Sequence, residues 1–210
     1  MAKRKRKNYA PVGLNKIPIF LSMIIIGIGI FVFMLSLKGL TGPNNEVTAP
    51  IEDPNLANEE FINQLVPVAK ELHQAYGILP SIILGQAILE SDWGRSELSA
   101  KYNNLFGIKS FSPHDDSVKL KTKEFKDGKW IEINANFKVY ASWGDCMRDH
   151  TLLFVNGVDW DPYLYQGVLL ASDYTTAANA LQSAGYATDP NYASKIISVI
   201  EKNKLYQYDK

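Results

Sequence analysis

A long apolar run follows a basic segment at the N-terminus of the chain. Residues 17–37 carry no charged side chain and are dominated by Ile, Phe, Leu, Met and Val. A helix of that length spans a bilayer. By the positive-inside rule, we expect residues 1–16 to form a cytoplasmic tail, residues 17–37 a single-pass transmembrane helix, and everything beyond them to be extracellular. A cleaved signal peptide would have a shorter apolar core and a small-residue cleavage site, so the pattern favours a retained anchor.

Beyond the apolar run, the periodicity of the chain is lost and then returns as a helical pattern. Residues 38–57 contain three prolines and little apolar repetition, which predicts an extended extracellular linker to a domain at residues 58–210. Asn58 is a good N-cap for a helix that ends at Gly77. Pro67 falls inside that helix and is expected to kink or split it.

The next helical pattern is apolar nearly all round, which is typical of a buried helix. It can start at Pro80, and Glu90 shares a stripe with Ile83 and Ala87. Burial and the negative helix end, closed by Gly94, would both raise the pKa of Glu90. Such a carboxyl suits general-acid cleavage of a glycosidic bond. The alternative is a buried glutamate paired with Arg95 or Lys101, and the spacing alone leaves both interpretations open.

A short helix or turn at residues 96–102 precedes a segment that alternates with period two. Residues 117–139 predict a β-hairpin whose turn is Asp127-Gly128. Glu124 falls on the face defined by Val118 and Leu120, away from the lysines. Glu124 is therefore a second acidic residue on a face that is otherwise apolar. The alternative interpretation is that it pairs with a lysine across the two strands.

Helical signals return after the hairpin and continue to the end of the chain. We expect helices starting at Ser142, at Ser172 or Asp173, and at Pro190. The fold class is therefore α+β, a mostly helical body with one inserted hairpin.

Charge and rare residues exclude several kinds of function. The formal net charge is zero, but all 22 acidic residues lie after residue 38, with only 15 of the basic ones, which leaves this part at minus seven. A nucleic-acid ligand is therefore not expected. The single cysteine, Cys146, excludes an internal disulfide. A Cys146–His150 nucleophile pair is disfavoured, because such groups usually come from different elements, and the histidines are too scattered for zinc. We expect no metal and no cofactor.

Several motifs together resemble one known family, the peptidoglycan N-acetylglucosaminidases of glycoside hydrolase family 73. The motifs are AILESDWGRS, NNLFGIK, TKEFKDGKW, FKVYASW and GYATDPNYASKI. The resemblance covers roughly residues 59–205 and implies a lysozyme-like fold, in which a β-lobe forms one wall of a glycan groove. It places the general acid at Glu90 and a second carboxylate at Glu124.

The resemblance also implies further site residues. Asn104, Phe106 and Gly107 would line the groove, and Tyr186 and Tyr192 would border the scissile bond. Aromatic rings that could stack on sugar faces are found at Trp93, Phe106, Trp130, Tyr186 and Tyr192.

The predicted function is that of a membrane-anchored hydrolase that cleaves the β-1,4 bond between N-acetylglucosamine and N-acetylmuramic acid in cell-wall glycan. Its expected partners are peptidoglycan strands, the lipid bilayer, and an integral-membrane or division-complex protein reached through the anchor. Two alternatives remain open: a lytic transglycosylase that leaves an anhydro sugar, and a catalytically idle glycan-binding scaffold. An inverting and a substrate-assisted mechanism fit equally well.

Overall fold

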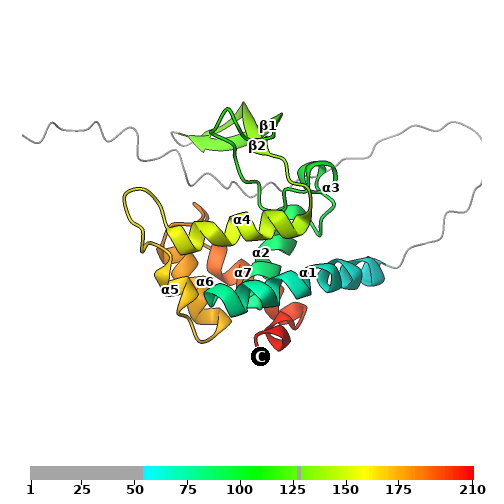
Figure 1. Ribbon diagram of the computed structural model, residues 1–210, viewed down its shortest axis with the longest axis vertical. Helices are drawn as coiled ribbons and strands as arrows, with labels where there is room; N and C mark the ends of the chain where they lie inside the picture. The colour runs from blue at the N-terminus through cyan, green and yellow to red at the C-terminus, as the bar shows by residue number, and fades with distance from the viewer. Residues whose placement is uncertain (1–53, 127–128) are drawn as a thin grey trace, which may run out of the picture.

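The computed structural model describes residues 54–126 and 129–210 (Figure 1). The predicted transmembrane helix and the Asp127-Gly128 turn lie outside these residues. No helix within them is long and apolar enough to span a bilayer. The elements are α1 (Pro54–Tyr76), α2 (Pro80–Ser91), α3 (Glu97–Tyr102), β1 (Ser117–Lys126), β2 (Lys129–Lys138), α4 (Trp143–Asn156), α5 (Gln166–Leu169), α6 (Tyr174–Ser183), α7 (Tyr192–Lys202) and the 3-10 helix η2 (Leu205–Tyr208). The predicted α+β class is confirmed.

Helix α2 is the centre of the hydrophobic core (Figure 1). Almost all of its side chains are buried, and it packs against α1, α6, α7 and η2. Gly85 allows α7 to approach closely, because a Cβ atom there would lie 3.1 Å from Cγ1 of Ile200. Each buried Leu or Ile side chain contributes roughly 1.5–3 kcal/mol, so α2 is fixed firmly in place.

Helix α1 differs from its prediction in two respects. The helix begins at Pro54, so Asn58 is not its N-cap. Proline fits the first turn, where no N–H is needed, and Asn58 instead accepts a hydrogen bond from Nη1 of Arg95 at 3.1 Å. Pro67 does not split α1, which runs through it as one helix. Pro67 is exposed, so the carbonyl that loses its helical partner there can be solvated.

The predicted hairpin is confirmed, with β1 and β2 antiparallel and Ser117 opposite Lys138. Val118 and Leu120 are partly buried, whereas Lys119 and Lys121 are exposed, as the alternation indicates. The backbone places Glu124 opposite Ile131. Figure 1 shows the hairpin projecting from the helical body on the side of α4.

Side-chain caps explain where the later helices start. Ser96, Ser142 and Asp173 each accept a hydrogen bond from a backbone N–H in the first turn of α3, α4 and α6, which confirms those predicted starts. The last helix starts at Tyr192 rather than at Pro190. The reason is a turn in which the Asp189 carboxylate accepts from the N–H of Asn191 at 2.9 Å.

Candidate active site

Glu90 lies one residue before the end of α2, where the backbone turns sharply. Asp92, Trp93 and Gly94 all have positive φ angles, of 51°, 61° and 76°. A Cβ atom at Gly94 would come within 2.8 Å of the Phe61 ring and 3.0 Å of Trp143, so no other residue fits there. A run of left-handed residues is strained, and such strain is common at functional sites. The turn ends the buried helix one residue after Glu90.

The Glu90 carboxyl is partly exposed and is bonded to a tyrosine from α7. The Tyr192 hydroxyl donates a hydrogen bond to Oε1 of Glu90 at 2.9 Å. Burial raises the pKa of Glu90 to about 7, against smaller lowering effects from the Tyr192 hydrogen bond and the Lys195 charge. A carboxyl with that pKa can hold a proton near neutral pH and release it to a substrate.

The ion-pair interpretation of Glu90 is wrong. Arg95 pairs with Asp92 at 3.2 Å, and Lys101 pairs with Glu97 at 2.9 Å. Both basic residues are thus engaged with exposed acids near α3. Glu90 keeps a hydroxyl partner in place of a cationic one.

A cluster of buried polar side chains lies behind Glu90, and two of its members, Gln86 and His150, were not among the predicted site residues. Gln86 donates from Nε2 to the Tyr192 hydroxyl at 3.1 Å. Nε2 of His150 and the hydroxyl of Tyr186 lie 2.8 Å apart. Burial lowers the pKa of His150 to about 3, so this histidine is neutral. The four-residue spacing of Gln86 and Glu90 on one helix could have indicated Gln86, but no local pattern joins His150 to Tyr186.

The expected sugar-stacking role is wrong for three of the predicted rings. Phe106 and Tyr192 are 0% exposed and Tyr186 is 1% exposed, so none of them offers a ring face to a ligand. They are buried because they pack on one another and on His150, which stacks on Phe106 at 3.8 Å. What Tyr192 presents to the site is its hydroxyl group.

Of the two tryptophans predicted to stack on sugars, only Trp93 has a side chain within the described structure. Trp93 is partly exposed and packs edge-on against Phe61, with 6.1 Å between the ring centroids. It borders a hollow of about 260 Å³ whose wall includes Asn58 and Tyr208. Trp130 is on β2, and its side chain lies outside the described structure.

Of the two other residues predicted to line the groove, Asn104 is buried and Gly107 is partly exposed. Asn104 is 1% exposed. Its Nδ2 donates to the carbonyls of Ile108 and Lys138, both at 2.9 Å, and its Oδ1 accepts from the N–H of Ile108 at 2.9 Å. Asn104 therefore ties the loop to the base of the hairpin, which corrects the expectation that it lines a groove. Gly107 is partly exposed, with a φ of 67° and open space where a Cβ would point, so it stays a candidate for close approach of a ligand.

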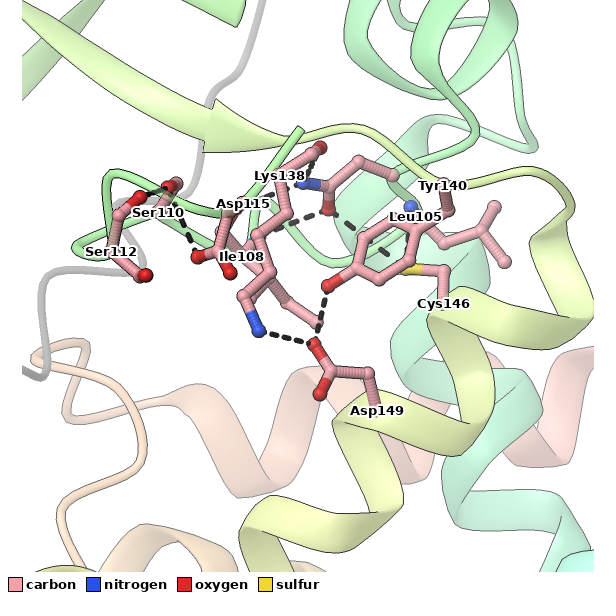
Figure 2. A network of polar contacts seen from close by, with 10 residues as sticks. Leu105, Ile108, Ser110, Ser112, Asp115, Lys138, Tyr140, Cys146 and Asp149 are labelled. Carbon is pink, nitrogen blue, oxygen red and sulfur yellow. Dashed lines mark hydrogen bonds and ion pairs between the residues drawn. The ribbon is translucent and has the colours of Figure 1, made fainter. Parts of the chain in front are cut away.

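The base of the hairpin is also tied to α4 (Figure 2). Nζ of Lys138 lies 2.8 Å from Oδ2 of Asp149, and the Tyr140 hydroxyl donates to the same oxygen at 2.6 Å. The Lys138 and Asp149 side chains are 29% and 34% exposed, so the pair is screened only in part. This contact connects the hairpin that carries Glu124 to the helical body.

Cys146 is a structural residue. Its sulfur accepts a hydrogen bond from the N–H of Leu105 at 3.3 Å, and burial raises the pKa of its thiol to about 12. His150 is bonded to Tyr186 and not to the thiol, so the disfavoured nucleophile pair does not form. Within residues 54–126 and 129–210, no group of three or more His, Cys, Asp or Glu side chains could hold a metal ion.

Comparison with known proteins places this site in a family. The sequence model of the glucosaminidase family, described as mannosyl-glycoprotein endo-beta-N-acetylglucosaminidase, matches residues 66–205. The chain belongs to this family. The family predicted from the motifs is therefore confirmed, and both Glu90 and Glu124 lie within the part of the glucosaminidase domain that matches.

Two curated bacterial proteins and one solved structure are similar to this glucosaminidase domain. The exo-glucosaminidase LytG of Bacillus subtilis is 49% identical over 150 residues, which are 71% of this chain and 52% of LytG. A probable N-acetylmuramidase of Lactococcus lactis is 36% identical over 159 residues, which are 73% of this chain and 35% of that protein. The chain thus spans about half of the one relative and about a third of the other.

The solved structure is the catalytic domain of the autolysin Auto from Listeria monocytogenes. It is 38% identical to this chain, with a TM-score of 0.68, and the match covers 80% of this chain and all of that domain. The likeness confirms a mostly helical, lysozyme-like fold with a small two-stranded sheet.

Proposed function

We propose that this domain hydrolyses the β-1,4 bond between N-acetylglucosamine and N-acetylmuramic acid in peptidoglycan, with Glu90 as the general acid. The observation that carries the proposal is a single carboxyl at the end of a buried helix, with its pKa raised to about 7. Family membership supports a glycosidase, and the named relatives include an exo-glucosaminidase and an autolysin.

The reaction requires an acid that protonates the leaving oxygen and a base that takes a proton from water. Glu90 gives its proton to the leaving glycosidic oxygen as the bond between that oxygen and the anomeric carbon breaks. Water then adds to the anomeric carbon and loses its proton to a base, so that atoms and charge balance. Glu124 on the hairpin is our candidate for the second carboxylate. It would activate that water in an inverting reaction, or support the substrate's acetamido group in a substrate-assisted one.

Mass spectrometry of digested peptidoglycan tests which bond is cut. The relatives are named for different bonds, since one is a glucosaminidase and another a probable muramidase. Products reduced with borohydride should carry N-acetylglucosamine at the new reducing end. Reduced muramic acid would overturn the assignment of the bond, and an anhydro sugar would indicate transglycosylation. Absence of any product, with glycan still bound, would favour the idle scaffold.

We further propose that the protein is anchored in the cell membrane with this domain outside. The support is the uncharged apolar run at residues 17–37 behind the basic cluster at residues 3–7. Protease added to intact protoplasts should then destroy the domain while the anchor stays in the membrane fraction. Recovery of a soluble, N-terminally trimmed domain from untreated cells would indicate a cleaved signal instead.

A further inference from the structure

We infer that Gln86 is a positioning residue that determines which oxygen of Glu90 carries the acid proton. This role rests on the proposed function, because it concerns the same general acid. Gln86 lies on α2, four residues before Glu90, and is fully buried. The two side chains therefore neighbour each other on the same face of the helix.

The Gln86 carboxamide acts only as a donor in the described structure. Its Nε2 donates to the Tyr192 hydroxyl at 3.1 Å. Among the described residues, its Oε1 is buried without a hydrogen-bond partner. A buried carbonyl without a partner is destabilising, and an apolar side chain would avoid it. Core packing alone therefore does not explain a glutamine at this position.

Donation by Gln86 fixes the direction of the next hydrogen bond. A tyrosine hydroxyl has one proton and can accept at its oxygen. Since the Tyr192 oxygen accepts from Gln86, its own proton is available for Oε1 of Glu90, 2.9 Å away. A proton on Oε1 would then face the proton of Tyr192. The acid proton of Glu90 consequently resides on Oε2, the oxygen that Tyr192 does not occupy.

Replacing the carboxamide tests this role. In Gln86→Met, the Tyr192 hydroxyl is free to accept a hydrogen bond from a protonated Oε1 of Glu90. In a fraction of the molecules the acid proton is then on Oε1, where it faces Tyr192 and not the substrate. We expect kcat to fall about tenfold with KM little changed, since only the reacting proton is misplaced. The pKa of Glu90 should rise, because its protonated form gains an acceptor. The charged or titratable groups that act on Glu90 are Tyr192 and Lys195 from α7, and Tyr186 in turn feels the charge of Glu90.

Two readouts separate this role from a structural one. Carboxyl 13C NMR of the free protein, with Glu90→Gln to assign the signal, follows the titration of Glu90 without any substrate. Steady-state kinetics on solubilised glycan strands gives kcat and KM. In a Tyr192→Phe background, Gln86→Met should lower kcat no further, because the hydroxyl that it orients is already gone.

A matched control lies on the same helix. Ser81→Ala removes another buried polar side chain of α2, which donates to Asp209 at 2.7 Å, and should leave kcat and the Glu90 titration unchanged. If Gln86→Met does not fold, Gln86→Glu keeps the shape and replaces the donor with an acceptor. It should change kcat and the Glu90 titration in the same direction.

Unchanged kcat and an unchanged Glu90 titration in a folded Gln86 variant would overturn the positioning role. The proposed function would survive that result if Glu90→Gln were inactive. An active Glu90→Gln enzyme would instead refute Glu90 as the general acid, whatever the Gln86 variants showed.

Discussion

Helix α2 and the β-hairpin carry the two candidate carboxylates and are held in place in different ways. Helix α2 is surrounded by α1, α6, α7 and η2, and almost all of its side chains are buried. The hairpin strands pair chiefly with each other, and the base is tied to the body through Asn104 and Asp149. A general acid needs fixed, desolvated surroundings to keep its pKa raised. A second carboxylate can instead lie on an element that changes position when the glycan binds. We therefore expect mutations in the two regions to act differently.

The largest effect should come from the carboxyl on the fixed helix. Glu90→Gln keeps the shape of the side chain and removes the proton donor, so turnover should fall on the order of a hundredfold to ten-thousandfold with binding retained. The measurement is the rate of product release from purified peptidoglycan, with circular dichroism to confirm folding. Glu97→Gln, an exposed acid on α3, is the control. Near-normal turnover in Glu90→Gln would refute the assignment.

The carboxyl on the hairpin should matter less. Glu124→Gln should lower turnover roughly tenfold to a hundredfold, because it removes assistance to water or to the acetamido group and leaves the proton donor intact. Glu132→Gln, at an exposed position on the opposite strand, is the matched control. If Glu124→Gln keeps full activity, a one-carboxylate mechanism is the better account, and an anhydro product should then be found.

The desolvated site of Glu90 should also be visible in the pH dependence of the protein. The pKa of Glu90 is raised to about 7 in the folded state, so folding favours its protonated form. This contribution to stability is fully present below about pH 4.5 and is lost as pH rises through about 7. The loss is at most about 3 kcal/mol, and partial exposure of the carboxyl reduces it.

Urea unfolding from pH 4 to pH 8 measures this change. Wild type should lose stability relative to Glu90→Gln as pH rises, and kcat should fall over the same interval because the acid deprotonates. A constant difference between the two proteins at every pH would contradict a raised pKa.

The smallest effect should come from the contact between the hairpin and α4. Lys138→Met breaks the ion pair with Asp149 and leaves that carboxylate bonded to Tyr140. We expect a stability loss of about 1 kcal/mol, and turnover a few-fold lower because the hairpin is less well held. Lys121→Met removes an exposed pair with Glu132 within the hairpin and should change neither. Equal activity losses in both variants would indicate a general charge effect instead.

Local patterns predicted the parts of the molecule that depend on neighbouring residues. The hairpin alternation and the caps at Ser142 and Asp173 are short-range features, and they are found as predicted. The stripe on α2 likewise indicated that Glu90 faces a desolvated site. The distribution of hydrogen bonds was not predictable in this way. Tyr192 and Glu90 are 102 residues apart in the chain, and no periodicity shows that a hydroxyl and not a cation would be the partner of Glu90.

The burial of the aromatic rings was missed for the same reason. Sequence alone shows that a ring is present, and not whether its face is covered by a histidine from a distant helix, as happens to Phe106, which His150 of α4 covers. The short elements α5 and η2 have only four residues each, too few to show a period.

The state of Cys146 makes the domain well suited to distance measurements by thiol labelling. The sulfur is buried, and its pKa of about 12 keeps it protonated at the pH of ordinary maleimide or methanethiosulfonate chemistry. Cysteines introduced at the exposed positions Lys121 on β1 and Lys202 on α7 could therefore carry spin labels while the native thiol stays in place. The separation between the hairpin and the helical body could then be followed in solution as glycan is added.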